Sequence, residues 1–195
     1  MRSAERACLQ DWRAELLEGA AGEVLEIGAG TGANVAHYSS TVERLVLAEP
    51  DGAMAARLER RLLRCRAGRV EVVRSHVERL PFEEGSFDAV VCTLVLCSVA
   101  DVGRALAEVQ RVLRPGGKLF FLEHVAADGR PSRLAWQRRI EPAWSRLAEG
   151  CHLTRRTGQS LREAGFVVEK ERRESLRGTL PFLRPSIRGV AKRAE

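Results

Sequence analysis

Val24-Leu25-Glu26-Ile27-Gly28-Ala29-Gly30-Thr31-Gly32 decides the fold of this chain. The apolar first half, rich in branched residues, predicts a buried β-strand, and the second half places glycine at every other position of a turn. Glycine lacks Cβ and tolerates unusual backbone angles, so a ligand can lie directly against the main chain here. A second apolar run, 45–48, ends at Glu49, where a carboxylate suits the two hydroxyls of a ribose. Together these features predict an adenosine-containing cofactor on a Rossmann-like sheet.

The spacing of the glycines indicates which cofactor. A dinucleotide site uses G-x-G-x-x-G, with a helix N-terminus directed at the pyrophosphate. This chain has G-x-G-x-G, preceded by Glu26, and an acidic side chain there repels phosphate and attracts an amino group. S-adenosylmethionine (SAM) has no phosphate and carries an ammonium, a sulfonium and a ribose. The residues therefore favour SAM over NAD, while an ordinary tight turn is the alternative reading of the glycines taken alone.

Composition limits the class of protein. The 195 residues fit one domain of a globular protein, with 45% hydrophobic and 30% charged residues. We see no apolar stretch near the roughly 20 residues that span a membrane and no signal-peptide core, so we expect a cytoplasmic protein. The net charge of +6 comes from scattered arginines with only 5% aromatic residues, which argues against a nucleic-acid partner. The five cysteines form no CxxC pair, so we expect reduced thiols and no metal site.

Strand-like and helix-like segments alternate along the chain. The predicted strands are 23–27, 45–48, 70–74, 87–93, 118–125, 166–170 and 187–191, the last as an edge strand. The predicted helices are 1–19, one that begins at Ala33, 53–66, 102–113, 132–147 and 157–164, and the turn 114–117 is expected to break the fourth of them. This alternation predicts an α/β fold with a mostly parallel seven-stranded sheet and helices on both faces.

Three motifs resemble those of class I SAM-dependent methyltransferases, in the same order. They are Glu26-Ile27-Gly28-Ala29-Gly30-Thr31-Gly32, then Leu80-Pro81-Phe82 with Gly85-Ser86-Phe87-Asp88, and finally Leu113-Arg114-Pro115-Gly116-Gly117. The resemblance extends over nearly the full length. It implies the Rossmann-like class I methyltransferase fold, with SAM as cofactor and S-adenosylhomocysteine as product.

A closer resemblance is to the methyltransferase-like family of small-molecule thiol S-methyltransferases. It is carried by residues 91–99, 123–125, 136–137, 141–144 and 150–154. It implies one domain over 1–195, with 1–20 as an N-terminal helix and 126–160 as a helical segment on the substrate side. Animal members carry a hydrophobic N-terminal anchor that this sequence lacks, so we expect a soluble relative without an integral membrane segment.

The resemblance assigns cofactor contacts to residues of this sequence. The residues that would bind the methionine portion of SAM are Glu26, Asn34 and the backbone of Gly28, Ala29, Gly30, Thr31 and Gly32. Glu49, which Pro50 follows, would bind the ribose. The adenine would contact Met54, His76, Val77 and the carbonyls of Cys92 and Thr93. Many relatives have Gly-Asp-Ala where this chain has Ser75-His76-Val77. His76 therefore either contacts adenine or points to solvent, and Met54 is either a contact or a core residue.

Methyl transfer from SAM is a direct SN2 displacement that needs no covalent enzyme intermediate. His124, at the end of the strand 118–125, is the candidate general base, because an imidazole titrates near pH 6.5 and the carboxyl end of a strand faces ligands in such sheets. The alternative is that His124 only orients a loop. Candidate substrate-binding residues are Leu96, Cys97, His124, Trp136, Ile140, Glu141 and Trp144, with ordinary core packing as the alternative for the tryptophans and Ile140.

The sequence leaves several functions open. A thiol is the first acceptor to consider, since it needs little help from a base, and a phenol, quinone or amine is the second. A SAM-binding module without catalysis is a third possibility. An RNA methyltransferase is disfavoured, because an Asn-Pro-Pro-Tyr-like motif is replaced by Cys92-Thr93-Leu94-Val95. The oligomeric state is left open.

Overall fold

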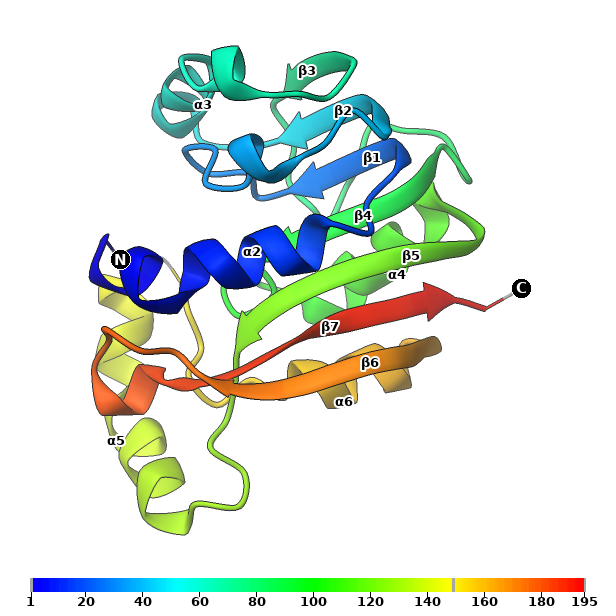
Figure 1. Cartoon of the computed structure of the whole chain (residues 1–195). Helices are drawn as coiled ribbons and strands as arrows, with labels where there is room; N and C mark the ends of the chain where they lie inside the picture. Colours follow the sequence, from blue (N-terminus) through cyan, green and yellow to red (C-terminus); the bar gives the residue numbers. More distant parts are fainter. Residues whose placement is uncertain (1, 149, 195) are drawn as a thin grey trace.

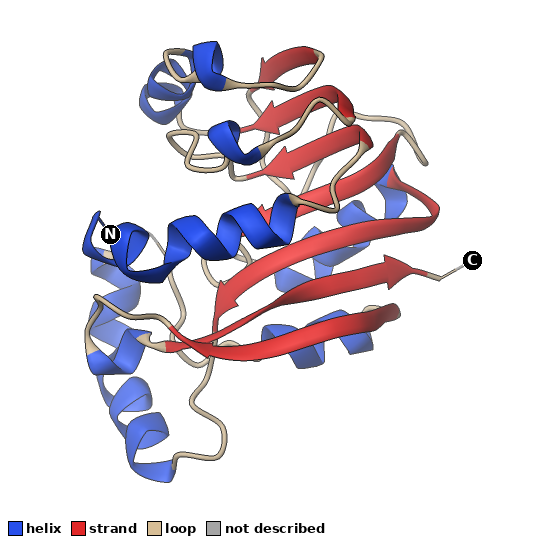
Figure 2. Ribbon diagram, viewed as in Figure 1, coloured by secondary structure: helices blue, strands red, loops and turns tan. Residues whose placement is uncertain are grey.

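A seven-stranded sheet forms the centre of the computed structural model, which describes residues 2–148 and 150–194 (Figures 1 and 2). The strands are β1 (Gly22–Ile27), β2 (Val42–Ala48), β3 (Arg69–Val73), β4 (Phe87–Thr93), β5 (Leu113–His124), β6 (Phe166–Ser175) and β7 (Pro185–Arg193), in the order β3-β2-β1-β4-β5-β7-β6. The first five strands pair in parallel, and β7 is antiparallel to both β5 and β6. The predicted mostly parallel seven-stranded sheet is confirmed.

One strand was placed wrongly from the sequence. We expected residues 187–191 at the edge of the sheet, but β7 lies between β5 and β6, and β6 is the edge strand. Ile187 and Ala191 of β7 are buried with α4 and α6 residues in one hydrophobic cluster, and β7 pairs with a strand on each side. Strand β6 is also longer than predicted, because it continues along β7 to Ser175.

Helices cover both faces of the sheet. The helices are α1 (Arg2–Ala4), α2 (Gln10–Leu17), α3 (Gly52–Glu59), α4 (Val102–Val112), α5 (Pro131–Leu147) and α6 (Thr157–Glu163), with a π-helical turn η1 (Glu5–Leu9) and 3₁₀ turns η2 (Val35–His37), η3 (Leu62–Arg64) and η4 (Pro181–Leu183). Figure 1 shows α2 in front of the sheet and α4 and α6 behind it. In the part of the chain that the structure describes, no helix combines the length and the apolar character that crossing a membrane requires.

The side chains of each strand divide between two cores, as the period of a strand dictates. In β4, Val90 and Cys92 join the cluster under α4, whereas Ala89 and Val91 join the cluster under α2. Helix α4 begins where the Asp101 side chain accepts a hydrogen bond from the Arg104 N–H at 3.0 Å. Each face of the sheet therefore carries an apolar core.

Three segments near the site differ from the sequence prediction. Only the turn η2 forms where a helix was expected from Ala33. The side chains of Asn34 and Tyr38, on either side of this turn, both donate hydrogen bonds to Glu26. The helix expected over 53–66 ends at Glu59, and the turn η3 follows it. Leu63 is 95% exposed in this turn, while Leu62 and Cys65 still pack against the cluster that holds Leu58. Residues 114–117 do end α4, but they form a bulge within β5, where the pairing with β4 shifts.

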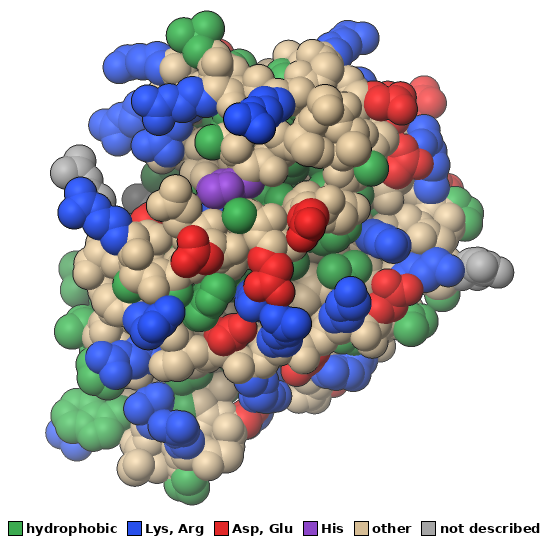
Figure 3. Space-filling model, viewed as in Figure 1, with side chains coloured by type: hydrophobic (Ala, Val, Ile, Leu, Met, Phe, Trp, Pro, Cys, Tyr) green, Lys and Arg blue, Asp and Glu red, His purple; other side chains and the backbone are tan. Residues whose placement is uncertain are grey.

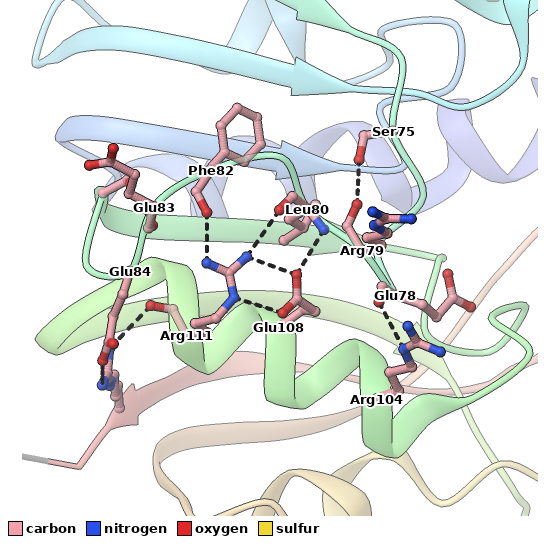
Figure 4. A network of polar contacts seen from close by, with 12 residues as sticks. Ser75, Glu78, Arg79, Leu80, Phe82, Glu83, Glu84, Arg104, Glu108 and Arg111 are labelled. Carbon is pink, nitrogen blue, oxygen red and sulfur yellow. Dashed lines mark hydrogen bonds and ion pairs between the residues drawn. The ribbon is translucent and has the colours of Figure 1, made fainter.

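Arg111 on α4 holds the long loop between β3 and β4 (Figure 4). Its guanidinium donates to the carbonyls of Phe82 at 2.6 Å and Leu80 at 3.0 Å and pairs with Glu108 at 2.7 Å. Glu108 in turn accepts from the Leu80 N–H at 2.8 Å. The same loop begins with residues 75–78, which line the cavity described next.

Candidate active site

A cavity of about 700 Å³ opens at the carboxyl ends of β1, β2 and β4, the edge where ligands bind in open α/β sheets. Most of the residues expected to bind the cofactor line this cavity. They are Glu26, Gly28, Ala29, Gly30, Thr31, Glu49, Pro50, Met54, His76, Val77 and Thr93. The topology thus brings together residues from four separate parts of the sequence at one concave surface.

The glycine-rich turn exposes its main chain to the cavity. Gly28 and Gly30 have φ angles of +60° and +58°, which only glycine adopts readily. A Cβ on Gly28 would lie 2.5 Å from Cγ2 of Val95, so this glycine allows close packing. A Cβ on Gly30 would meet nothing closer than 3.9 Å, so that position faces open space. A ligand can therefore occupy the volume that a side chain at Gly30 would fill.

Glu49 connects the turn after β1 to the turn after β2. Its Oε2 accepts a hydrogen bond from the Gly30 N–H at 2.7 Å, and its Oε1 accepts from the Asp51 N–H at 2.9 Å. The residue is only 5% exposed, yet it belongs to the cavity wall. Each carboxylate oxygen has further lone pairs, so Glu49 can accept hydroxyl donors from a ligand.

Glu26 is the centre of a buried polar network. It accepts hydrogen bonds from Tyr38 Oη at 2.7 Å and from Asn34 Nδ2 at 2.9 Å. Burial raises the pKa of Glu26 to about 7, although Tyr38, Arg13 and Asn34 each act to lower it. A carboxyl group with this pKa is partly protonated at neutral pH, and a cationic ligand group beside it would favour the ionised form.

Arg13 is the main functional residue that the sequence analysis missed. Its side chain is 4% exposed, and Nη1 donates to Asn34 Oδ1 and to Thr93 Oγ1, both at 2.8 Å. Arg13 and Glu5 line the cavity and form an ion pair at 3.3 Å. The sequence did contain one indication of this role. Arg13 lies on the same helical face as Leu9, Leu16 and Leu17, and a charged residue on such an apolar face is rarely buried without a polar partner.

Leu94 is a second cavity residue that no sequence pattern indicated. It is the only described residue other than glycine with a positive φ, +60°. Its N–H donates to the Leu122 carbonyl at 2.7 Å, so the parallel pairing of β4 and β5 fixes the strained conformation. Strain of this kind is often found at binding sites. The rest of the wall here is Val95, Ser98, Val99, Ala100 and Ala148.

Three residues expected at the cofactor lie behind the cavity wall. Asn34 is fully buried in the Glu26 network. A Cβ on Gly32 would lie 2.7 Å from Cδ1 of Leu58, so this glycine provides space for α3. The thiol of Cys92 donates to Oε1 of Glu123 at 3.3 Å. These three residues therefore contact other residues, Glu26, Leu58 and Glu123, and do not line the cavity themselves.

The residues expected to bind the acceptor do not line this cavity in the described part of the chain. Leu96 and Cys97 are buried, and Glu123 accepts their N–H groups at 3.1 and 3.2 Å as well as that of Val95 at 2.9 Å. Glu141 accepts from the Thr154 N–H at 2.9 Å and from His152. These contacts make both glutamates organisers of loops around the cavity.

The tryptophans of α5 lie further from the cavity. Trp136 is 63% exposed beside Phe182, and Trp144 packs edge to face on Phe182 with 5.5 Å between ring centroids. Ile140 is partly buried on the same helix. Gln137, which sequence reasoning missed, is buried and anchors α5 through Ala127, Val125 and Phe182. Figure 1 shows α5 beyond the carboxyl end of β5.

His124 points at sulfur rather than into the cavity. Its Nε2 lies 3.2 Å from Sγ of Cys151, and Cys97 is close to both. The thiol of Cys97 donates toward Cys151, which raises the pKa of Cys97 and lowers the pKa of Cys151. His124 lowers the pKa of Cys151 further. Its role as a base remains a prediction.

Lys and Arg side chains gather at the upper left of the view in Figure 3, without acidic side chains between them. Over the rest of that face they alternate with acidic and apolar side chains. Elsewhere the buried Arg188 pairs with Glu15 at 2.8 Å and with Glu174 at 3.0 Å.

Comparisons with known proteins identify relatives. The methyltransferase domain family matches residues 25–121. Thiol S-methyltransferase TMT1B from rat is 40% identical over 154 residues, which are 77% of this chain and 63% of the rat protein. TMT1B from human is 41% identical over 180 residues, 90% of this chain and 73% of the human protein. The crystal structure of a SAM-dependent methyltransferase from Methanosarcina mazei is similar with a TM-score of 0.70 at 19% identity, over 92% of this chain and 95% of that one. The chain thus spans less than two thirds of the rat protein.

Proposed function

Because the chain belongs to the family of SAM-dependent methyltransferases that includes thiol S-methyltransferase TMT1B, we propose that it transfers a methyl group from SAM to a small-molecule thiol. The observation that carries this proposal is the match to human TMT1B over 180 residues. It extends well beyond residues 25–121 and so includes the segments that follow the cofactor side of the fold. The fold alone would not support an acceptor, since this architecture hosts many chemistries.

The residues around the cavity fit SAM. The open space at Gly30 admits a ligand against the main chain, and the free lone pairs of Glu49 would accept the ribose hydroxyls. Glu26, held by Asn34 and Tyr38, would pair with the ammonium group. Met54, His76 and Val77 line the wall that would contact adenine. The acidic side chain of Glu26 would repel a pyrophosphate, which supports SAM over a dinucleotide, whereas Glu49 suits the ribose of either cofactor.

Bound SAM supplies an electrophilic methyl group on a positively charged sulfur. The task of the chain is to hold an acceptor in line with that bond and to exclude water, and good alignment contributes at most about 7–11 kcal/mol. Val95, Val99 and Ala148 give the wall an apolar character that suits a neutral thiol. Arg13 and Glu5 would cover the cavity from the N-terminal helical segment.

The acceptor proton requires little assistance if the acceptor is a thiol. An unperturbed thiol has a pKa of about 8.5, so a few per cent of its molecules are thiolate at neutral pH. A phenol is much less ionised at this pH. We propose His124 as the proton acceptor, reached by way of Cys151, which it contacts at 3.2 Å. Six residues that lie outside the cavity lining would determine the shape of the acceptor-binding side indirectly. They are Leu96, Cys97, Trp136, Ile140, Glu141 and Trp144.

The test is a matched panel of acceptors. A thiol, a phenol and an amine on one aromatic scaffold are incubated with SAM and the protein, and methylated products are measured by mass spectrometry. We expect methylation of the thiol, and its loss in a Glu49→Ala variant that has lost SAM binding. Methylation of the phenol or amine but not the thiol would replace the proposal with the second acceptor class. No product from any acceptor, with SAM binding measured by calorimetry, would favour a binding module.

A further inference from the structure

Cys97, His124 and Cys151 form a cluster that the cavity does not include. They come from three segments: the loop after β4, the end of β5 and the loop after α5. Their donor atoms, two Sγ and one imidazole nitrogen, all lie within 4.8 Å of one another, and Cys151 Sγ is 3.2 Å from His124 Nε2. Because 27 residues separate each member from the next, no local spacing in the sequence indicates the cluster.

The main chain holds the two cysteine loops together before any ligand binds. The His152 N–H donates to the Cys97 carbonyl at 2.8 Å. Gly150, with φ +82°, packs so closely that a Cβ would lie 3.0 Å from the Ser98 carbonyl oxygen. Glu123, the residue before His124, accepts the Cys97 N–H at 3.2 Å. The three donors are therefore positioned by contacts other than their own.

The donor set and its dimensions match a tetrahedral zinc ion. Zinc binds Cys sulfur at about 2.3 Å and His nitrogen at about 2.0–2.1 Å, so a tetrahedral site separates its donors by roughly 3.5–3.8 Å. The observed separations bracket this range, with 3.2 Å for one pair and 4.8 Å as the upper limit. Bringing a pair from this upper limit to the tetrahedral separation takes at most about 1 Å of side-chain movement.

The surroundings are also suitable for a metal ion. Cys97 and Cys151 are 1% and 6% exposed, and two thiolates would balance the charge of a divalent cation in this buried place. The buried Nε1–H of Trp144 makes no hydrogen bond among the described residues and adjoins the Cys151 sulfur. An N–H group next to a ligating sulfur is typical of the outer partners that tune metal sites.

We propose that Cys97, His124 and Cys151 bind a thiophilic divalent metal ion, best matched by Zn²⁺, through two thiolate sulfurs and one imidazole nitrogen. Each ligand that is still protonated loses its proton to solvent when the ion binds, so that both sulfurs coordinate as thiolates, and the fourth position is left for water or a small ligand. This inference does not depend on the proposed methyl acceptor. It competes with the role of His124 as a base, because coordination occupies Nε2.

The experiment measures metal binding directly. The full chain is purified with a reductant, freed of metal with a chelator, dialysed against Zn²⁺ and analysed by elemental mass spectrometry, and Co²⁺ is used as a spectroscopic probe for thiolate-to-metal charge transfer. We expect one Zn²⁺ per chain, and we expect Cys97→Ser and Cys151→Ser each to weaken binding at least about tenfold, the lower end of what even outer partners cost. Cys65→Ser, a partly buried cysteine outside the cluster, should bind as the original chain does.

A second measurement avoids reliance on variants that fold poorly. Alkylation of each cysteine is followed by mass spectrometry with and without Zn²⁺, and we expect Zn²⁺ to protect Cys97 and Cys151 but not Cys65. The proposal is overturned if the original chain binds no more Zn²⁺ than the serine variants, or if Zn²⁺ leaves the alkylation of Cys97 and Cys151 unchanged. It is equally overturned if these two residues are found joined by a disulfide in the reductant-treated chain.

Discussion

Nη1 of Arg13 lies 2.8 Å from Oδ1 of Asn34, and this contact determines which end of the amide meets Glu26. With its oxygen facing the guanidinium, Asn34 must present Nδ2 to the carboxyl group of Glu26, which it does at 2.9 Å. The N-terminal helical segment therefore acts on the cofactor cavity through one buried side chain. A further Arg13 contact, to Thr93 at 2.8 Å, ties the same guanidinium to the end of β4.

We expect Arg13→Met to weaken SAM binding at neutral pH by about 10-fold or more, since hydrogen bonds to charged groups contribute roughly 1.5–3 kcal/mol. The substitution frees the Asn34 amide and removes the positive charge that lowers the pKa of Glu26. Calorimetric titration with SAM measures the effect. Arg6→Met is the matched control, because Arg6 is an exposed arginine of the same helical segment. Equal affinities of the two variants would contradict this account.

The titration of Glu26 predicts that SAM affinity rises with pH. The pKa of Glu26 is raised to about 7 by burial, so the carboxyl is largely protonated at pH 6 and largely ionised at pH 8. An ammonium group binds the ionised form, so binding near pH 6 must release a proton from Glu26. Calorimetry in two buffers of different ionisation enthalpy measures that release directly.

Glu26→Gln is the control for this pH dependence, because it keeps the shape of the side chain and removes its titration. We expect the variant to bind SAM weakly and to release no proton near pH 6. It should also alter stability with a definite sign. Between the ordinary pKa of 4.5 and about 7, folded Glu26 binds more protons than unfolded Glu26, so its contribution to stability falls as pH rises through this window. A proton release in Glu26→Gln equal to that of the original chain would refute the assignment.

Glu49→Ala should weaken SAM binding by about 10- to 100-fold, because it removes a charged acceptor from the ribose and releases the Gly30 N–H. Glu43→Ala, which removes an exposed carboxylate from β2, the strand that Glu49 follows, should bind SAM like the original chain. Binding is measured by calorimetry and folding by thermal melting. Unchanged affinity in Glu49→Ala, with the fold intact, would remove Glu49 from the ribose site.

Much of the fold could be predicted because local patterns determine it. The apolar runs of β1, β2 and β4 and the glycine turn follow directly from residue type and period, and Glu26 and Glu49 were expected on the cavity for the same reason. The order of β7 and β6 could not be predicted, since strand pairing depends on contacts between distant segments. The same limit applies to Cys97, His124 and Cys151, which only the tertiary structure brings together.

Errors near the site have a different cause. The helix expected from Ala33 does not form beyond the turn η2, and Asn34 and Tyr38 on either side of that turn donate to Glu26. Arg13 was missed because a lone arginine on an apolar face is not a known cofactor motif. The first case shows polar groups at the binding site overriding local propensity, as is expected where function and folding compete.

Arg111→Leu should destabilise the fold by about 1–3 kcal/mol, because it leaves the carbonyls of Leu80 and Phe82 without their donor. Arg104→Leu, on the same helix, removes one contact to the Glu78 carbonyl and should lower the free energy of unfolding by less.

The hydrogen bond from Arg111 lowers the pKa of Glu108, so this part of the stabilisation is present above the ordinary pKa of 4.5 and is lost as pH falls below it. Denaturant unfolding at pH 7 and pH 3.5 therefore separates the two effects: the difference between the original chain and Arg111→Leu should shrink at the lower pH. Since the loop held by Arg111 begins at the cavity wall, SAM affinity should also fall in Arg111→Leu. Equal stability of the two variants at pH 7 would show that Arg111 does not hold the loop in solution.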